Sequence, residues 1–112
     1  MRVLVTGGRD YDDYEQVCCV MWDISPTELC CGGASGLDSL VERWGRMNGV
    51  SVQVFPAQWE VHGKAAGPIR NQQMLDDFKP DIGVVFPGGR GTADMEQRMR
   101  RTPGLTVVKV DV

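Results

Sequence analysis

The sequence lacks the features that mark several well-known protein classes. No apolar run approaches the ~18 residues of a membrane span, and the N-terminus leads directly into a strand-like segment without a signal-peptide layout. Basic residues are not in excess, because the net charge is −3 and the sequence pI is about 5.0. No overall basic surface therefore favours nucleic acid. We expect a cytoplasmic protein without a membrane partner, and nucleic acid is disfavoured as a partner.

Spacings typical of metal and redox sites are also missing. The four cysteines form two adjacent pairs, Cys18-Cys19 and Cys30-Cys31, with no CxxC motif. Neighbouring residues in a helix or strand point in different directions, so such a pair is poorly placed to direct two thiolates at one metal. We expect buried, reduced cysteines that act as small apolar residues. We expect no metal and no cofactor, and His62, the single histidine, is interpreted as incidental rather than as a proton shuttle.

The pattern of apolar residues predicts one α/β domain over residues 1–112. Buried-strand patterns occur at 2–6, 28–31, 50–55, 81–86 and 106–110, and helical spacings at 12–24, 37–47, 69–78 and 92–101. Residues 57–67 show no clear period and are expected to be irregular. Strands that alternate with helices predict a Rossmann-like fold, with a mostly parallel sheet of about five strands and helices on both faces.

Three glycine-rich loops each follow a predicted strand. They are Thr6-Gly7-Gly8-Arg9-Asp10, Cys31-Gly32-Gly33-Ala34-Ser35-Gly36 and Phe86-Pro87-Gly88-Gly89-Arg90-Gly91-Thr92. Glycines let the backbone approach an anion closely, and the first free N–H groups of the next helix point at it. Ligands of such sheets bind at the carboxyl ends of the strands. The loops are therefore predicted to converge on a nucleotide-like ligand.

The loops do not fit the common nucleotide fingerprints. The first loop is not G-x-G-x-x-G, and no Gly-Lys-Ser/Thr follows any of them, so neither an NAD site nor a P-loop ATPase is supported. Arg9 can pair with a phosphate, while Asp10 and Asp38 either cap the following helices or bind. The expected ligand-binding residues are Gly7, Gly8, Arg9, Asp10, Gly32, Gly33, Ser35, Gly36, Arg70, Asn71, Pro87, Gly88, Gly89, Arg90, Gly91 and Thr92.

Candidate side chains also lie between and beyond the loops. Arg70 and Asn71 follow Gly67-Pro68 near a helix start, where they can contact a phosphate or a carbonyl. Trp59 either stacks on a base or closes the edge of the core. Asp94 and Glu96 follow the third loop, where a carboxylate either caps the helix or stabilises an oxocarbenium-like centre.

Taken together, these motifs resemble the YspA-related branch of the SLOG superfamily. The resemblance rests on Val5 to Asp10, Gly32 to Asp38, Gly67 to Asn71 and Pro87 to Thr92, and it spans essentially the whole chain. It implies a Rossmann-like domain that binds nucleotides or nucleotide-derived ligands and forms homo-oligomers. The superfamily includes the LOG phosphoribohydrolases, which release a base from a nucleoside monophosphate, and the DprA/Smf DNA-processing proteins.

Three functions are consistent with the motifs and the resemblance. The first is binding of a nucleotide-derived small molecule by a sensor, a sink or a processing factor. The second is LOG-like cleavage of the N-glycosidic bond of a nucleoside 5′-monophosphate, with Arg70, Asp94 and Glu96 as catalytic residues. Pro87 to Thr92 matches the LOG Pro-Gly-Gly-x-Gly-Thr motif, but the LOG Met-His-Glu-Arg-Lys sequence is absent, so binding ranks first. The third, single-stranded DNA handling, is disfavoured by the acidic pI and the aromatic content of 7%.

Overall fold

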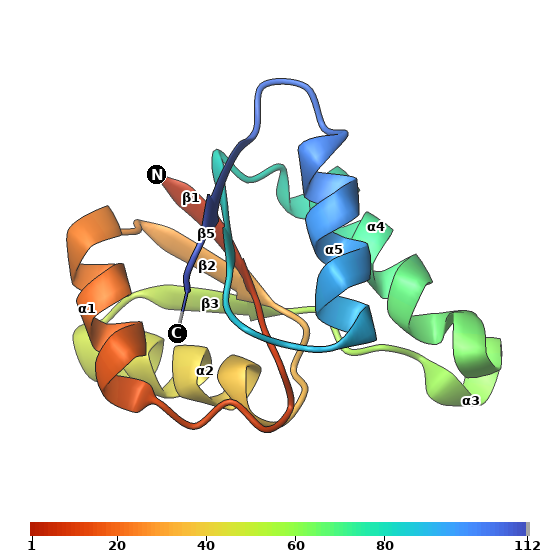
Figure 1. The fold of residues 1–112 in the computed structure, drawn as a ribbon, viewed down its shortest axis with the longest axis horizontal. Coiled ribbons are helices and arrows are strands. Elements are labelled where there is room, and N and C mark those ends of the chain that lie inside the picture. The colour runs from red at the N-terminus through yellow and green to blue at the C-terminus, as the bar shows by residue number, and fades with distance from the viewer. Residues whose placement is uncertain (112) are drawn as a thin grey trace.

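The computed structural model describes residues 1–111, and its strands and helices alternate along the chain (Figure 1). The strands are β1 (Arg2–Thr6), β2 (Glu28–Cys31), β3 (Ser51–Val54), β4 (Ile82–Val85) and β5 (Thr106–Lys109). The helices are α1 (Tyr14–Ile24), α2 (Leu37–Asn48), α3 (Trp59–His62), α4 (Ala66–Phe78) and α5 (Arg90–Arg100), with a 3-10 turn at Gly63–Ala65. None of the helices within residues 1–111 has the length and apolar character needed to cross a membrane.

All five strands are parallel and lie in the order β3-β2-β1-β4-β5. The chain builds outward from β1 to β3, then crosses back to place β4 on the other side of β1. Strand order therefore reverses between β1 and β4, which is where a doubly wound sheet opens a crevice for a ligand. The predicted Rossmann-like α/β fold is confirmed.

The helices cover the sheet from both sides, with α1 and α2 on one face and α4 and α5 on the other (Figure 1). Alternation along β1 explains the two cores, since successive side chains of a strand point to opposite faces. Val3 and Val5 pack with α1 and α2, whereas Leu4 between them packs with α4 and α5. All three side chains are fully buried, so both faces of β1 are covered.

Several expectations differ from the structure, among them the start of α4, which lies at Ala66 and not at residue 69. Residues 57–67 are not irregular, because α3 and the 3-10 turn occupy most of them; helices this short carry too few residues to show a period. Helix α5 begins at Arg90, two residues before the predicted start, so the third glycine loop extends into its first turn. The expectation of buried cysteines is right for Cys30 and Cys31 but wrong on α1, where Cys18 is half-buried and Cys19 is exposed. Burial raises the pKa of the Cys31 thiol to about 12.

Candidate functional site

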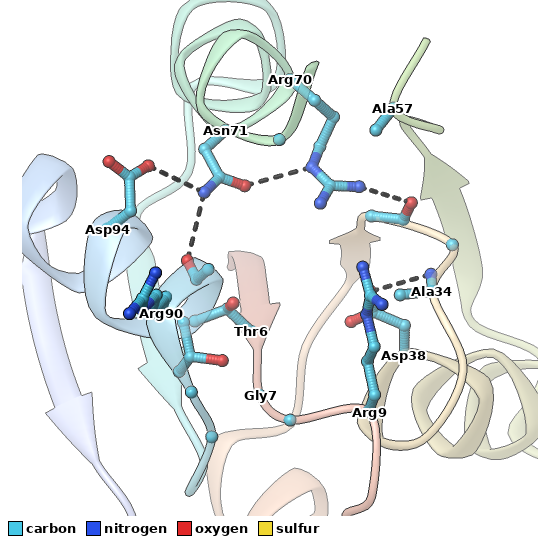
Figure 2. Close-up of a pocket in the computed structure, with 18 of the residues that line it drawn as sticks. Thr6, Gly7, Arg9, Ala34, Asp38, Ala57, Arg70, Asn71, Arg90 and Asp94 are labelled. Carbon is cyan, nitrogen blue, oxygen red and sulfur yellow. Dashed lines mark hydrogen bonds between the residues drawn. The ribbon is translucent and has the colours of Figure 1, made fainter. Parts of the chain in front are cut away.

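A cleft of about 1270 Å³ opens at the carboxyl ends of the central strands (Figure 2). Strands β2, β1 and β4 end side by side, and each is followed by one of the glycine-rich loops. Residues of all three loops line the cleft, and α3 and α4 contribute residues from above the sheet edge. The volume exceeds the 300–1,000 Å³ that is usual for small-molecule sites, so the cleft has room for a ligand of nucleotide size or larger.

The loop after β1 holds the other two loops together. The Gly8 N–H donates to the Pro87 carbonyl over 2.9 Å, and the Gly8 carbonyl accepts from the Leu37 N–H over 3.1 Å. A Cβ at Gly8 would lie 3.0 Å from the Cα of Gly88. The backbone itself thus joins the starts of α2 and α5 across β1, and a side chain at Gly8 would force these loops apart.

Gly36 is required by the same packing rather than by contact with the cleft. Its φ of +73° lies in a region that L-residues rarely adopt. A Cβ there would lie 2.2 Å from the Arg9 carbonyl oxygen, a backbone atom that cannot easily move aside. Gly36, a predicted binding residue, is not among the residues that line the cleft. It packs instead against the backbone of Gly8 and Arg9 in the first loop.

The start of α5 forms one corner of the cleft wall. Gly89 is the N-cap residue and no side chain caps the helix, so the first N–H groups have no partner within the helix. Gly88 lies so close to Thr92 that a Cβ would meet its Oγ1 at 2.2 Å. Arg90 is exposed beside this turn and has no ion-pair partner among residues 1–111. This corner of the cleft presents unpaired N–H groups and a free positive charge.

Arg70 extends from α4 across the side of the cleft that faces the start of α5. Its Nη1 donates to the Gly32 carbonyl over 2.8 Å and to the Phe55 carbonyl over 3.3 Å. A Cβ at Gly32 would lie 2.3 Å from Nη1, so the glycine makes room for the guanidinium. Burial lowers the pKa of Arg70, and the charge of Asp38 works in the opposite direction. An arginine remains protonated in spite of such a shift, so Arg70 contributes a fixed positive charge.

Asn71 is buried and uses its whole amide inside the protein (Figure 2). Its Nδ2 donates to the Asp94 Oδ2 over 3.0 Å and to the Gly91 carbonyl over 3.3 Å, and its Oδ1 accepts from the Arg70 Nε over 3.1 Å. The side chain thereby fixes Arg70, Asp94 and the first turn of α5 relative to one another. Within the cleft it is placed to position other groups.

Asp94 lines the cleft as an ionised carboxylate. Both of its hydrogen bonds reach Oδ2, from Asn71 and from the Arg98 Nε over 2.8 Å. Burial by itself would raise the pKa of Asp94, but these two hydrogen bonds and the Arg98 charge outweigh it and lower the pKa. Glu96, the other predicted catalytic carboxylate, is not in the cleft lining; it pairs with Arg100 and Lys109 on the surface.

Asp38 is a cleft residue that was not among the predicted binding residues. It is only 6% exposed, and the Ala34 N–H donates to its Oδ2 over 3.1 Å. Burial raises the pKa of Asp38 to about 6, although the Ala34 N–H and the Arg70 charge lower it. Its position in the first turn of α2 suggested either a cap or a ligand contact, and no sequence signal distinguishes the two because only the fold shows its burial.

All the other predicted ligand-binding residues line the cleft. They include Pro87, Gly88 and Arg90 of the third loop. Trp59 also lines it and is 50% exposed, whereas His62 is not part of the lining. No group of three or more histidine, cysteine, aspartate or glutamate side chains within residues 1–111 is arranged to hold a metal ion.

Two comparisons with known proteins identify sequences that are similar to this chain. The family model described as "YspA, cpYpsA-related SLOG family" matches residues 1–62, a segment that contains the first two glycine loops. The chain is also 34% identical to the Gene 61 protein of Mycobacterium phage D29, in an alignment of 122 residues that covers 96% of this chain and 94% of that protein.

Proposed function

Because the chain belongs to the YspA, cpYpsA-related SLOG family, we propose that its cleft binds a nucleotide or a nucleotide-derived small molecule. The observation that carries the proposal is the meeting of three glycine loops around a cleft of about 1270 Å³. Two of these loops lead directly into helix starts, at α2 and α5. Such starts favour anions through their free N–H groups and the helix dipole.

The phosphate of the ligand binds at the first turn of α5. The N–H groups of this turn are uncapped by any side chain, and Arg90 supplies a positive charge that no carboxylate within residues 1–111 neutralises. Arg9 is a second exposed cleft cation without an ion pair in the same part of the chain. A free arginine beside exposed N–H groups provides charge-assisted hydrogen bonds for a phosphate.

The remainder of the ligand extends along the cleft toward α3 and α4. Trp59 presents a half-exposed ring there, suited to stacking on a base. Arg70 lies on the same side with its position fixed by the Gly32 and Phe55 carbonyls. Fixed groups and a preformed cleft suit a protein that senses, sequesters or presents such a ligand, and self-association of this chain would be compatible with each of these roles.

Thermal shift with a nucleotide panel tests the binding proposal. AMP, ADP-ribose, NAD and a cyclic dinucleotide are added separately to the protein, and the supernatant of each sample is then analysed by chromatography. At least one compound is expected to raise the unfolding midpoint, and Arg90→Ala and Arg70→Ala are expected to reduce that shift. Arg46→Ala, which removes an exposed charge from the far end of α2, is the matched control. A shift that survives Arg90→Ala would contradict the phosphate position.

Cleavage of an N-glycosidic bond is the second candidate function, and the state of Asp94 favours it. The carboxylate stays ionised because its pKa is lowered, and its Oδ1 accepts no hydrogen bond from residues 1–111. A fixed negative charge with one free oxygen in the cleft can stabilise the positive charge that develops on a ribosyl group. Glu96 is directed elsewhere and takes no part in this proposal.

Free base in the supernatant distinguishes the two functions. If the protein is a phosphoribohydrolase, AMP incubated with it yields adenine, and Asp94→Asn abolishes the release while the thermal shift persists. Glu96→Gln is the control, because it removes a carboxylate from the same helix but outside the cleft. If AMP stabilises the protein and is recovered unchanged, the chain binds without cleaving.

A further inference from the structure

Asp38 is a buried carboxylate that the fold satisfies only in part. It lines the β2 side of the cleft and is 6% exposed. The Ala34 N–H donates to Oδ2, and the Gly32 N–H also interacts with the carboxyl and lowers its pKa. Oδ1 is not among the sealed, unpartnered oxygens of residues 1–111, so it is accessible from the cleft. Figure 2 shows Asp38 bonded to Ala34, on the wall opposite Asp94. A carboxylate oxygen that faces a cleft is available to a hydrogen-bond donor of a ligand.

The fold makes limited use of this negative charge, because the dipole of α2 favours a carboxylate in its first turn only weakly. Closing the loop at Ala34 requires one acceptor oxygen, which an asparagine supplies equally well. Arg70 lies near enough to influence Asp38, yet its guanidinium donates to the Gly32 and Phe55 carbonyls and forms no ion pair with Asp38 within residues 1–111. The carboxylate is thus buried without a salt bridge, although an uncharged residue of the same shape would serve the loop.

The charge also does not suit a phosphate. A carboxylate repels an anion, so the part of the ligand that lies against Asp38 is not its phosphate. Strand β1 separates β2 from β4, and adjacent strands are spaced by about 4.8 Å, so the loops after β2 and β4 begin about 10 Å apart. A ligand with its phosphate at α5 brings its sugar or base, and not the phosphate, to the β2 side.

We propose that Oδ1 of Asp38 accepts a hydrogen bond from a neutral donor of the ligand, a sugar hydroxyl or a base amino group, and so selects the ligand and its orientation in the cleft. This inference rests on the proposed nucleotide-binding function. Asp38 then acts as a specificity-determining residue. It discriminates against compounds that lack the donor, because these exclude water from the carboxylate oxygen without replacing its hydrogen bond.

Titration calorimetry on Asp38→Asn tests the inference, with AMP and inorganic phosphate as probes. A hydrogen bond to a charged group corresponds to a loss of about 10- to 100-fold in AMP affinity when the acceptor is replaced. Phosphate binding is expected to be unchanged or tighter, since a negative charge leaves the cleft. Asp23→Asn makes the same charge change at the exposed end of α1 and is expected to alter neither affinity.

Analogues of AMP identify the donor. The wild-type protein is titrated with 2′-deoxy-AMP, 3′-deoxy-AMP and purine riboside monophosphate, which lacks the amino group. For one analogue, the affinity of the wild type is expected to fall to the affinity that Asp38→Asn has for AMP. The variant Asp38→Asn is expected to bind that analogue and AMP with equal affinity. A selective loss with a deoxy compound identifies a hydroxyl, and one with the purine compound identifies the amino group.

The unfolding midpoint of the free protein provides a second measurement that does not depend on a ligand. Asp38→Asn is expected to raise the midpoint, because the variant removes a buried charge that has no ion pair within residues 1–111. Asp38→Ala is measured as well. It removes both the charge and the oxygen that accepts from Ala34, so the difference between the two variants gives the contribution of that hydrogen bond. A lower midpoint for Asp38→Asn, or unchanged or tighter AMP binding, would overturn the inference and leave the binding proposal intact. If none of AMP, ADP-ribose, NAD and the cyclic dinucleotide binds the wild type, both proposals fall.

Discussion

The amide nitrogen of Asn71 lies 3.0 Å from the Asp94 Oδ2, and this hydrogen bond ties helix α4 to helix α5 at the edge of the cleft. The same side chain accepts from Arg70 and donates to the Gly91 carbonyl. Three groups on two helices are therefore held by one buried amide, and Asn71 is 4% exposed. A site that is fixed before its ligand arrives loses little conformational entropy on binding.

Asn71→Ala should weaken both the fold and the site. Removing three hydrogen bonds from a buried position is expected to lower the free energy of unfolding by about 1–3 kcal/mol. Asn71→Asp should cost more, because a carboxylate would face the Asp94 carboxylate and the Gly91 carbonyl. Urea unfolding at pH 7.5 measures both effects, with Gln73→Ala on the exposed face of the same helix as the control. Equal stabilities for Asn71→Ala and Gln73→Ala would contradict the bridging role.

Gly36→Ala should lower the free energy of unfolding much more than Gly63→Ala, a substitution that brings similar backbone strain. Gly36 and Gly63 have similar dihedral angles, with φ of 73° and 56° and ψ of −125° and −131°. A Cβ at Gly36 would lie 2.2 Å from the Arg9 carbonyl, whereas one at Gly63 would meet nothing within 4 Å. Both variants bear about 1–3 kcal/mol of strain, and only Gly36→Ala adds a backbone clash.

Chemical denaturation of the two variants separates these contributions. Gly36→Ala is expected to lose at least about 2 kcal/mol more than Gly63→Ala, in the range of other steric disruptions of a packed interior. If both lose the same amount, the contact between the second loop and the Arg9 carbonyl does not restrict the backbone as the structure indicates.

Gly32→Ala should displace Arg70 with a smaller effect on the fold. The new Cβ would meet Nη1 at 2.3 Å and Cζ at 2.7 Å, both at the flexible end of the arginine. The guanidinium can swing away, so the hydrogen bond to the Gly32 carbonyl is lost while the loop survives. We expect a loss of AMP-induced thermal shift as large as that of Arg70→Ala. In the Arg70→Ala background the substitution should have little further effect, and a fully additive result would contradict this coupling.

The sequence predicted the sheet and most of the cleft because both depend on local patterns. Short apolar runs ending in glycine loops mark buried parallel strands, and their carboxyl ends meet at one edge whatever the details of packing. Residues such as Gly88 and Arg90 could therefore be assigned to the cleft from their place after β4. The short helix α3 could not, since four residues from Trp59 to His62 make barely one turn.

Side-chain roles depended on tertiary contacts that no local pattern records. Asp94 and Glu96 are two residues apart on α5, which places them on different faces of the helix. The fold turns Asp94 into the cleft and Glu96 toward β5, where it pairs with Lys109. Burial of Asp38 results from packing around the start of α2, so its importance appears only in the structure.

The titration of Asp38 gives a pH dependence whose sign can be worked out. Its pKa in the folded protein is raised to about 6 from an ordinary value of 3.8. Between pH 4 and pH 6, the folded protein therefore keeps Asp38 protonated, whereas the unfolded chain has released this proton. The contribution of this group to stability is therefore most favourable below pH 4 and is lost as the pH rises through 6. Above pH 7 the ionised carboxylate costs about 3 kcal/mol, at 1.36 kcal/mol for each pKa unit.

Asp38→Asn removes this titration and leaves the other ionisable groups in place. The titratable groups that interact electrostatically with Asp38 are Arg70, Glu42 and the thiols of Cys30 and Cys31. Both thiols stay protonated throughout because burial raises their pKa values, that of Cys31 to about 12. We expect the variant to exceed the wild type in free energy of unfolding by more at pH 7.5 than at pH 4.5, as measured by urea unfolding at both values. A difference that is constant with pH, or larger at pH 4.5, would show that the Asp38 carboxylate is not held at a raised pKa in the folded protein.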